Sequence, residues 1–236
     1  MIRQYCRLLD HASLWYLPII GPFIGFLILT SSISGSHAAA QENPSLKFFW
    51  RKALNRGPTE FNSVELDGTG KGKFQFKERN SDSVVIDLVL QPATVNTLLN
   101  LFIQADFLNE GKDFVSTRKV ADMGMKTIQF EMGSRKREVS FNYTEDRGAQ
   151  QIVNFFENLS LQEKTLFEID LALKYDRLGI PKQLDELAKS MKANRIVAPE
   201  RFASVLDRIY QDDSIINYAR VEARKLLAEM QKSTSR

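Results

Sequence analysis

An alternation of apolar and polar residues runs along the chain from Phe61 to Leu90. The apolar positions recur at every second residue and form three groups: Val64 and Leu66, then Phe74 and Phe76, then Val84, Ile86, Leu88 and Leu90. A period of two is typical of strands in a sheet that buries one face. Turn-forming residues separate the groups, at Asp67–Gly70 and at Asn80–Asp82. The pattern therefore predicts three short antiparallel strands.

A second hairpin is centred on Gly133 and Ser134. Glycine in the first position suits the two-residue loop of a type II′ turn. That loop pairs Ile128 with Val139 and places Glu131 opposite Lys136. It also gathers one apolar face, made of Ile128, Phe130, Met132, Val139 and Phe141. One register satisfies both the apolar face and a charge pair, so we predict two more strands and a small sheet of about five strands.

The remaining apolar patterns have the spacing of helices. Pro92 opens a predicted helix that continues to Ala105. From about Gly148 a stripe recurs every seven residues, at Ile152, Leu159, Leu166 and Leu173, and predicts one long helix ending near Asp176. Three shorter helices are predicted to follow, at Pro181–Lys192, Pro199–Tyr210 and Ser214–Gln231.

The segment Pro44–Arg56 also has apolar residues at helical spacing. They are Leu46, Phe49, Trp50, Ala53 and Leu54. The stripe predicts a short amphipathic helix packed on the sheet. Aromatic residues combined with basic ones are equally typical of a helix that lies in a membrane interface. The alternative prediction is therefore a membrane-surface contact through Lys47, Phe49, Trp50, Arg51 and Lys52.

Residues 1–40 have the three-part pattern of a secretory signal peptide. Arg3 and Arg7 precede an apolar stretch from about Leu14 to Leu29, and a run of small residues ends in Ala38-x-Ala40. An uncleaved membrane anchor is the alternative, because the apolar stretch approaches the roughly 20 residues that span a bilayer. Both interpretations predict that the chain is exported.

Cysteine and histidine occur only in or beside this leader, as Cys6, His11 and His37. A chain that begins near Gln41 therefore has no Ser-His-Asp triad, no cysteine nucleophile and no His/Cys zinc site. We expect no catalytic, cofactor-binding or metal-binding residues. An exported chain without disulfides favours a bacterial periplasm. The net charge is only +3, from 32 basic and 29 acidic residues, which gives no general attraction to nucleic acid.

Four carboxylates lie near the ends of the second hairpin: Asp113, Asp122, Glu145 and Asp146. A glycoside hydrolase needs two carboxylates in a cleft, one of them with a raised pKa. If these side chains converged, the chain would have the minimum equipment for hydrolysing cell-wall polymer. Solvated loop acids are the competing interpretation.

Four segments of the chain resemble uncharacterised exported bacterial proteins. They are Val64–Gly70, Val120–Gly124, Val139–Thr144 and Leu171–Asp176, and the likeness extends over about Phe61 to Leu187. The resemblance implies export and implies no activity.

These patterns together predict an α+β fold, in which a small antiparallel sheet packs with helices and a helical C-terminal region follows. We expect a signal peptide or anchor at 1–40, an α+β domain at 41–159, and a helical region at 160–236 that continues the long helix. The predicted function is a non-enzymatic envelope or periplasmic module that binds a protein or another envelope partner, with no nucleic acid and no cofactor. The alternative is the carboxylate-based hydrolase.

Overall fold

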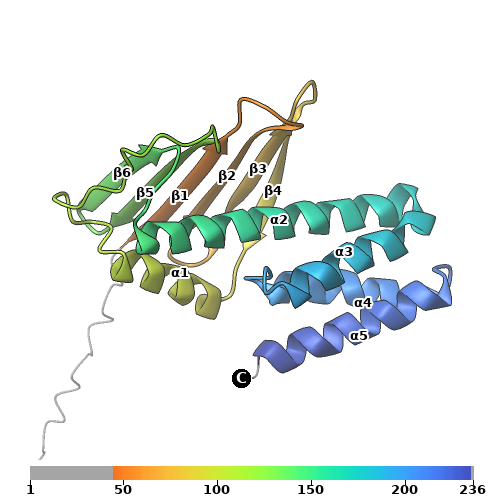
Figure 1. The fold of residues 1–236 in the computed structure, drawn as a ribbon. Coiled ribbons are helices and arrows are strands. Elements are labelled where there is room, and N and C mark those ends of the chain that lie inside the picture. Colours follow the sequence, from red (N-terminus) through yellow and green to blue (C-terminus); the bar gives the residue numbers. More distant parts are fainter. Residues whose placement is uncertain (1–44, 235–236) are drawn as a thin grey trace, which may run out of the picture. The chain divides into compact units, whose positions relative to one another are not determined.

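A six-stranded antiparallel sheet and five α-helices make up residues 45–234, the part of the chain that the computed structural model describes (Figure 1). The fold is α+β, as the sequence predicts. The strands are β1 (Leu46–Ala53), β2 (Thr59–Asp67), β3 (Lys71–Glu78), β4 (Ser83–Val89), β5 (Met125–Met132) and β6 (Arg135–Phe141). The helices are α1 (Pro92–Gln104), α2 (Arg147–Tyr175), α3 (Ile180–Lys192), α4 (Ala203–Gln211) and α5 (Asn217–Thr234). The predicted leader at 1–40 lies outside the described residues.

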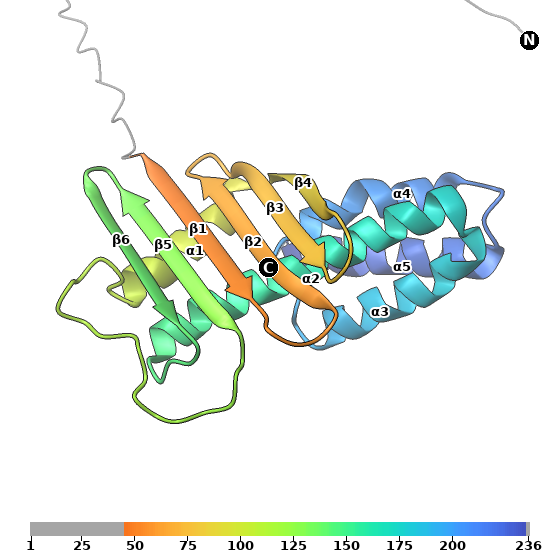
Figure 2. The same ribbon diagram turned by 90° about the horizontal axis from the view of Figure 1, so that it is seen from above.

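The strands lie in the order β4-β3-β2-β1-β5-β6. The first strand in sequence is thus central, between the β2–β3–β4 meander and the β5–β6 hairpin. Helices α1 and α2 lie on one face of the sheet, and no element of residues 45–234 covers the other face (Figure 2). This one-sided cover explains the alternation of apolar and polar residues along the strands.

The segment predicted as an amphipathic helix at Pro44–Arg56 contains strand β1, Leu46–Ala53, so this prediction is wrong. The apolar residues fit a helical stripe, but Leu46, Phe48 and Trp50 also alternate at the period of a strand. Aromatic side chains favour strands, and β2 and β5 on either side supply its backbone partners. The extra strand raises the sheet from the predicted five strands to six.

The β5–β6 hairpin has the predicted register, with Ile128 opposite Val139 and Glu131 opposite Lys136. Gly133 has a φ of 63°, which glycine adopts without strain. The predicted charge pair is different, however. Glu131 binds Lys47 of β1, with 3.2 Å between Nζ and Oε1, because the central strand lies on its other side.

The long helix α2 links two hydrophobic cores. Its first half packs Phe155, Phe156 and Leu159 into a core shared with the sheet and α1. Its second half contributes Ile169 and Ala172 to a separate core with α3, α4 and α5. The predicted boundary after Leu159 thus lies inside a continuous helix.

Two short 3-10 helices connect the C-terminal helices: η1 (Arg177–Gly179) precedes α3, and η2 (Pro199–Phe202) precedes α4. The predicted helix at Pro199–Tyr210 is therefore a 3-10 turn followed by α4. The predicted helix at Ser214–Gln231 begins at Asn217.

Candidate functional site

The uncovered face of the sheet, which we call the open face, carries the candidate site. Along β1, Phe48 and Trp50 point to the helices and are 1% and 0% exposed. Lys47, Phe49 and Arg51 alternate with them and so point to the open face. The open face of this central strand is thus built from one aromatic and two basic side chains.

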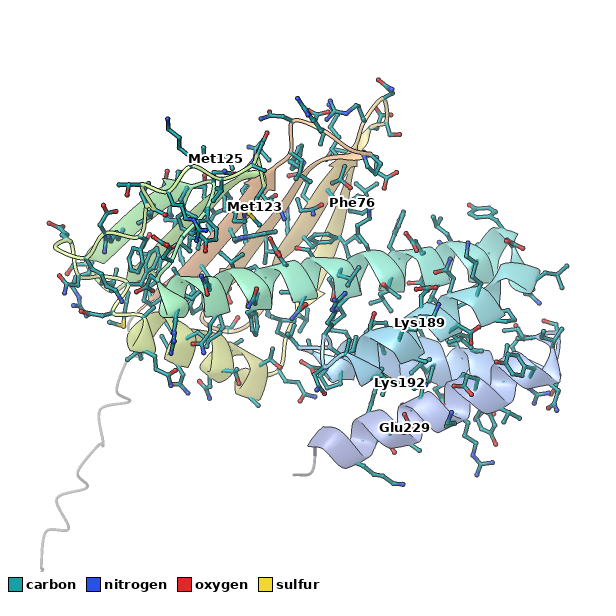
Figure 3. All side chains as sticks on the ribbon, in the orientation of Figure 1. Phe76, Met123, Met125, Lys189, Lys192 and Glu229 are labelled. Carbon is teal, nitrogen blue, oxygen red and sulfur yellow. The ribbon has the colours of Figure 1, made fainter. Side chains whose placement is uncertain are left out.

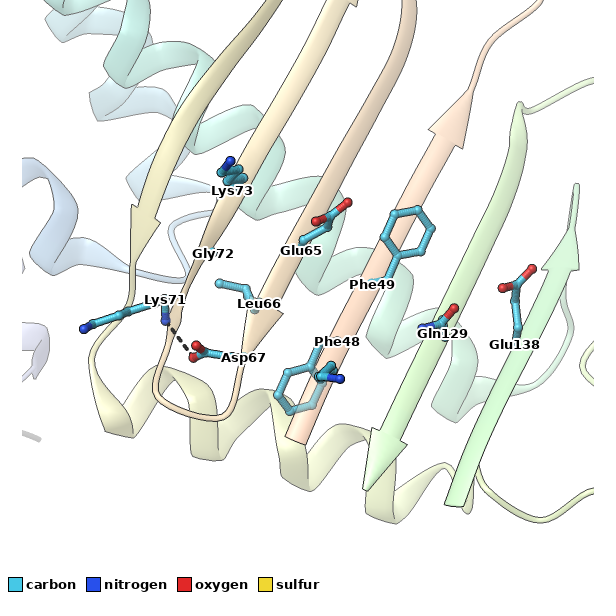
Figure 4. Close-up of a pocket in the computed structure, with 11 residues that line it drawn as sticks. Phe48, Phe49, Glu65, Leu66, Asp67, Lys71, Gly72, Lys73, Gln129 and Glu138 are labelled. Atoms are coloured by element: carbon cyan, nitrogen blue, oxygen red, sulfur yellow. Dashed lines mark hydrogen bonds between the residues drawn. The ribbon is translucent and has the colours of Figure 1, made fainter. Parts of the chain in front are cut away.

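The strand register aligns six residues in one row across the open face, which we call the cross-strand row. Phe49 lies opposite Glu65 on one side and Gln129 on the other. The complete row, from β4 to β6, is Asp87, Lys73, Glu65, Phe49, Gln129 and Glu138. At the usual spacing of neighbouring strands the row is about 24 Å long. Figure 4 shows five of its members on the sheet.

A shallow depression of about 780 Å³ follows the middle of this row. Lys47, Lys71 and Asp67 also line it, and Figure 4 shows Asp67 beside Lys71 at the β2–β3 turn. Asp67 is held by the β2–β3 turn, because its Oδ1 accepts hydrogen bonds from Thr69 N at 2.8 Å and Lys71 N at 3.1 Å. Burial alone would raise the pKa of Asp67, but these bonds and the Thr69 hydroxyl lower it.

The charged members of the row are free to meet a partner. Within residues 45–234, the side chains of Glu65, Lys73 and Glu138 form no hydrogen bond or ion pair. With Asp87 included, the row carries three acidic residues and one basic residue, a formal charge of −2. A surface of this kind suits a partner that is neutral or of mixed charge, and not a polyanion.

The predicted membrane-contact residues are divided between the two faces of the sheet. Lys47, Phe49 and Arg51 lie on the open face, where Arg51 packs over the Phe61 ring at 4.6 Å. Trp50 is fully buried and stacks on Phe156. Lys52 faces α2, where its Nζ is 2.7 Å from Glu157. No amphipathic helix presents the five residues together, and a membrane contact through the three on the open face stays a prediction.

The four loop carboxylates are each engaged locally. Asp113 accepts from Val115 N at 2.8 Å, and Glu145 accepts from the Ser116 hydroxyl at 3.1 Å. Asp122 accepts from Asn55 Nδ2 at 2.8 Å and from Gly124 N, and the Asn55 bond is the main reason its pKa is lowered. A general acid needs the opposite shift.

Asp146 caps the N-terminus of α2. Its side chain accepts from Ala149 N at 2.8 Å and pairs with Lys112 at 2.9 Å. Burial would raise the pKa of Asp146, but the Ala149 bond and Lys112 outweigh it and lower the pKa. The structure therefore gives Asp146 a structural role at a helix end, where a negative charge is favourable.

We expect Asp146→Ala to cost about 0.5–2 kcal/mol of unfolding free energy at neutral pH. A carboxylate with a lowered folded-state pKa stabilises above its unfolded pKa, and loses that contribution as the pH falls through the folded pKa. Wild type and variant should therefore converge in acid. Urea unfolding at about pH 7 and about pH 3 checks this. The Asp146→Asn variant keeps a side-chain oxygen that can accept the cap hydrogen bond, but it has no charge that titrates. If the difference in unfolding free energy between wild type and Asp146→Ala persists in acid, the capping role of the Asp146 carboxylate is contradicted.

Lys126 is a buried lysine whose role was not identified from the sequence. Lys126 is 6% exposed, and its Nζ donates to the carbonyl oxygens of Met123, Gly124 and Asn142 at 2.9–3.2 Å. Burial lowers the pKa of the amine, and the charge of Lys52 adds to this. All three donors of the ammonium are used. Lys126 thus ties the 113–124 loop to the end of β6, and a lysine in a strand gives no sequence signal of this role.

Neither a metal-binding group nor a membrane-spanning helix is found in the described chain. No group of three or more His, Cys, Asp or Glu residues within it is placed to hold a metal ion. None of the helices in residues 45–234 is long and apolar enough to cross a membrane. No family model matches the sequence, and no curated protein is significantly similar to it. The cross-strand row is therefore the candidate site on geometry alone.

Proposed function

We propose that the chain is an exported protein of the bacterial envelope that binds a macromolecular partner across the open face of its sheet, without catalysis. The leader pattern at 1–40 supports export. One observation carries the binding proposal: the cross-strand row presents unpaired charges on either side of Phe49, on a rigid six-stranded support.

The row combines the two features that binding surfaces need. Phe49 is a half-buried aromatic ring on the central strand, and an aromatic side chain has few rotamers to lose on contact. Glu65, Lys73 and Glu138 offer charged groups that bind nothing else in residues 45–234, so a partner need not break existing pairs. The row offers both signs of charge, with three acidic groups and the one basic group of Lys73, and so favours a protein surface of mixed charge or a neutral envelope polymer.

Crosslinking from one position in the row tests the proposal. A photoreactive side chain placed at Gln129, in cells that express the full chain, should give an adduct of defined mass. The same group at Lys192, an exposed residue of α3, is the matched control and should give none.

Charge reversal shows whether the adduct reflects this surface. Lys73→Glu places three acidic residues in succession along the row, Glu65 and Asp87 being its neighbours. We expect it to reduce the Gln129 adduct by about tenfold, without changing the thermal unfolding temperature by more than a surface change does. An adduct of equal yield from Lys192, or one insensitive to Lys73→Glu, would reject the proposal.

A further inference from the structure

The two edges of the sheet are protected to very different degrees. The β6 edge begins with Arg135, Lys136 and Arg137, and charged side chains discourage strand pairing. The 113–124 loop also binds near the end of β6, through Ser116 N to Tyr143 O at 3.3 Å. The β4 edge has the sequence Ser-Val-Val-Ile-Asp-Leu-Val, with no basic residue and no proline.

Strand β4 has backbone groups that face away from the sheet. Asp87 O accepts from Arg201 Nη2 at 3.2 Å, so this carbonyl points away from β3. Backbone groups of a strand point to the same side at every second residue, so those of Val85 and Ser83 also face outward. Nothing in the described chain hydrogen-bonds to the Val85 backbone from that side. The outward backbone groups of Val85 are therefore available to pair with another strand, whereas the Asp87 carbonyl is already bound by Arg201.

Apolar side chains flank this edge on both faces, next to the polar Ser83 and Asp87 of the open face. Val85 is 54% exposed on the open face. On the other face Val84 and Ile86 are half-buried, as is Phe167 of α2. The Phe167 ring packs edge-on against Phe76, at 5.5 Å, and Phe76 is the strand partner of Val84. Phe76, labelled in Figure 3, lies between the sheet and α2. An added strand would thus find apolar surface on both of its faces.

The shape of the described unit limits what can occupy the edge. Helix α2 and the helices after it project beyond β4 on the helix-covered side of the sheet (Figures 1 and 2). A second copy that continued the sheet edge to edge would bring its own helical layer into this space. A single extended peptide, which needs only the width of one strand, meets no such obstacle.

We propose that the β4 edge from Ser83 to Asp87 binds an extended peptide segment of another protein as a seventh strand. Alternate side chains of the peptide are apolar and face Val84, Ile86 and Phe167. The others face the open side and include a basic residue beside Asp87, the one charged residue of β4, whose carboxylate has no ion pair within residues 45–234. Main-chain hydrogen bonds would supply affinity and these side chains specificity. This site shares Asp87 with the end of the cross-strand row, but neither proposal depends on the other.

Peptide binding to the purified chain tests the proposal. The probes are short fluorescent peptides in which valine alternates with lysine or with glutamate, and a valine–lysine peptide with N-methylated backbone amides. We expect the valine–lysine peptide to bind at least about tenfold more tightly than the other two. Equal binding of the N-methylated peptide, or no binding of the valine–lysine peptide, would overturn the proposal.

Two pairs of variants place the binding on β4. Val85→Pro removes an outward N–H that β3 does not use, whereas the control Val85→Thr keeps it; only the first should abolish binding. Asp87→Lys should reverse the preference, so that the valine–glutamate peptide binds better, whereas Asp82→Lys in the preceding turn should not. Because Asp87 is exposed, its variant remains informative if the proline variant fails to fold. An unchanged preference in Asp87→Lys would overturn the proposal.

Discussion

Replacing Arg201 with alanine should lower the free energy of unfolding by about 3–5 kcal/mol, because the change leaves a carboxylate charged and unpaired in the interior. Its partner Glu163 is 0% exposed. The guanidinium donates twice to it, from Nε at 3.1 Å and from Nη2 at 2.8 Å. The Glu163 hydrogen bond is also the main reason that the pKa of Arg201 is raised.

The expected loss is large because this ion pair connects the two cores. Arg201 belongs to η2 and Glu163 to α2, and Arg201 also donates to the β4 edge. Beside the pair, Gln162 accepts from Val197 N and Ala198 N and donates to Ala198 O. Removing Arg201 therefore weakens the attachment of the C-terminal helices to the sheet.

Urea unfolding at neutral pH measures the loss, with Arg208→Ala as the matched control. Arg208 pairs with Asp170 at 3.1 Å, but both side chains are largely exposed, at 56% and 42%. Exposed pairs contribute only about 0–1 kcal/mol. Equal effects of the two alanine variants would show that burial of Glu163 does not determine the stability of this junction.

Phe102→Ala should cost about 3–5 kcal/mol, the usual range for removing a buried phenylalanine ring. Phe102 is 1% exposed and lies at the centre of an aromatic cluster. Its ring centroid is 4.5 Å from that of Phe130 and 5.1 Å from that of Phe107, and the Phe48 and Phe156 rings are also in contact. This one side chain joins α1 to β1, β5 and α2.

The neighbouring residue Ile103 is 57% exposed on the same helix and provides the control. Ile103→Ala should change the free energy of unfolding by no more than about 0.5 kcal/mol. Thermal unfolding of the two variants separates the effects. If Phe102→Ala lowers the free energy of unfolding only slightly, the aromatic cluster closes around the cavity and does not hold α1 on the sheet.

The sequence predicted correctly those elements whose turn residues and apolar pattern match the way the element packs in the fold. The Gly133 hairpin is such a case, because turn chemistry and the apolar face require one register. The stripe of α2 is another, since it stays apolar through both cores. Strand β1 could not be predicted in the same way, because aromatic residues on both of its faces mimic a helical stripe. Its central place depends on strands β2 and β5, which follow it in sequence.

The candidate site was even less accessible to sequence. Glu65 and Lys73 are partners in one hairpin, but Gln129 is far from Phe49 along the chain, and only the strand order places β5 beside β1 and completes the row. The same holds for Glu163 and Arg201, which are 38 positions apart. The loop carboxylates show the opposite case, because their places near the ends of the second hairpin suggested a site, whereas the structure uses each of them in its own hydrogen bonds.

The accessibility of a single thiol at Glu65 tests the central claim most directly. Cys6 is the one cysteine of the chain, so Cys6→Ser with Glu65→Cys gives a single thiol in the cross-strand row. Leu178→Cys, at a position 81% exposed in η1, is the reference. If the open face binds a partner, maleimide should label the Glu65 position at least about tenfold more slowly in intact envelopes than in the purified chain, while the Leu178 position stays unchanged. Equal labelling of the Glu65 position in both preparations would contradict the account.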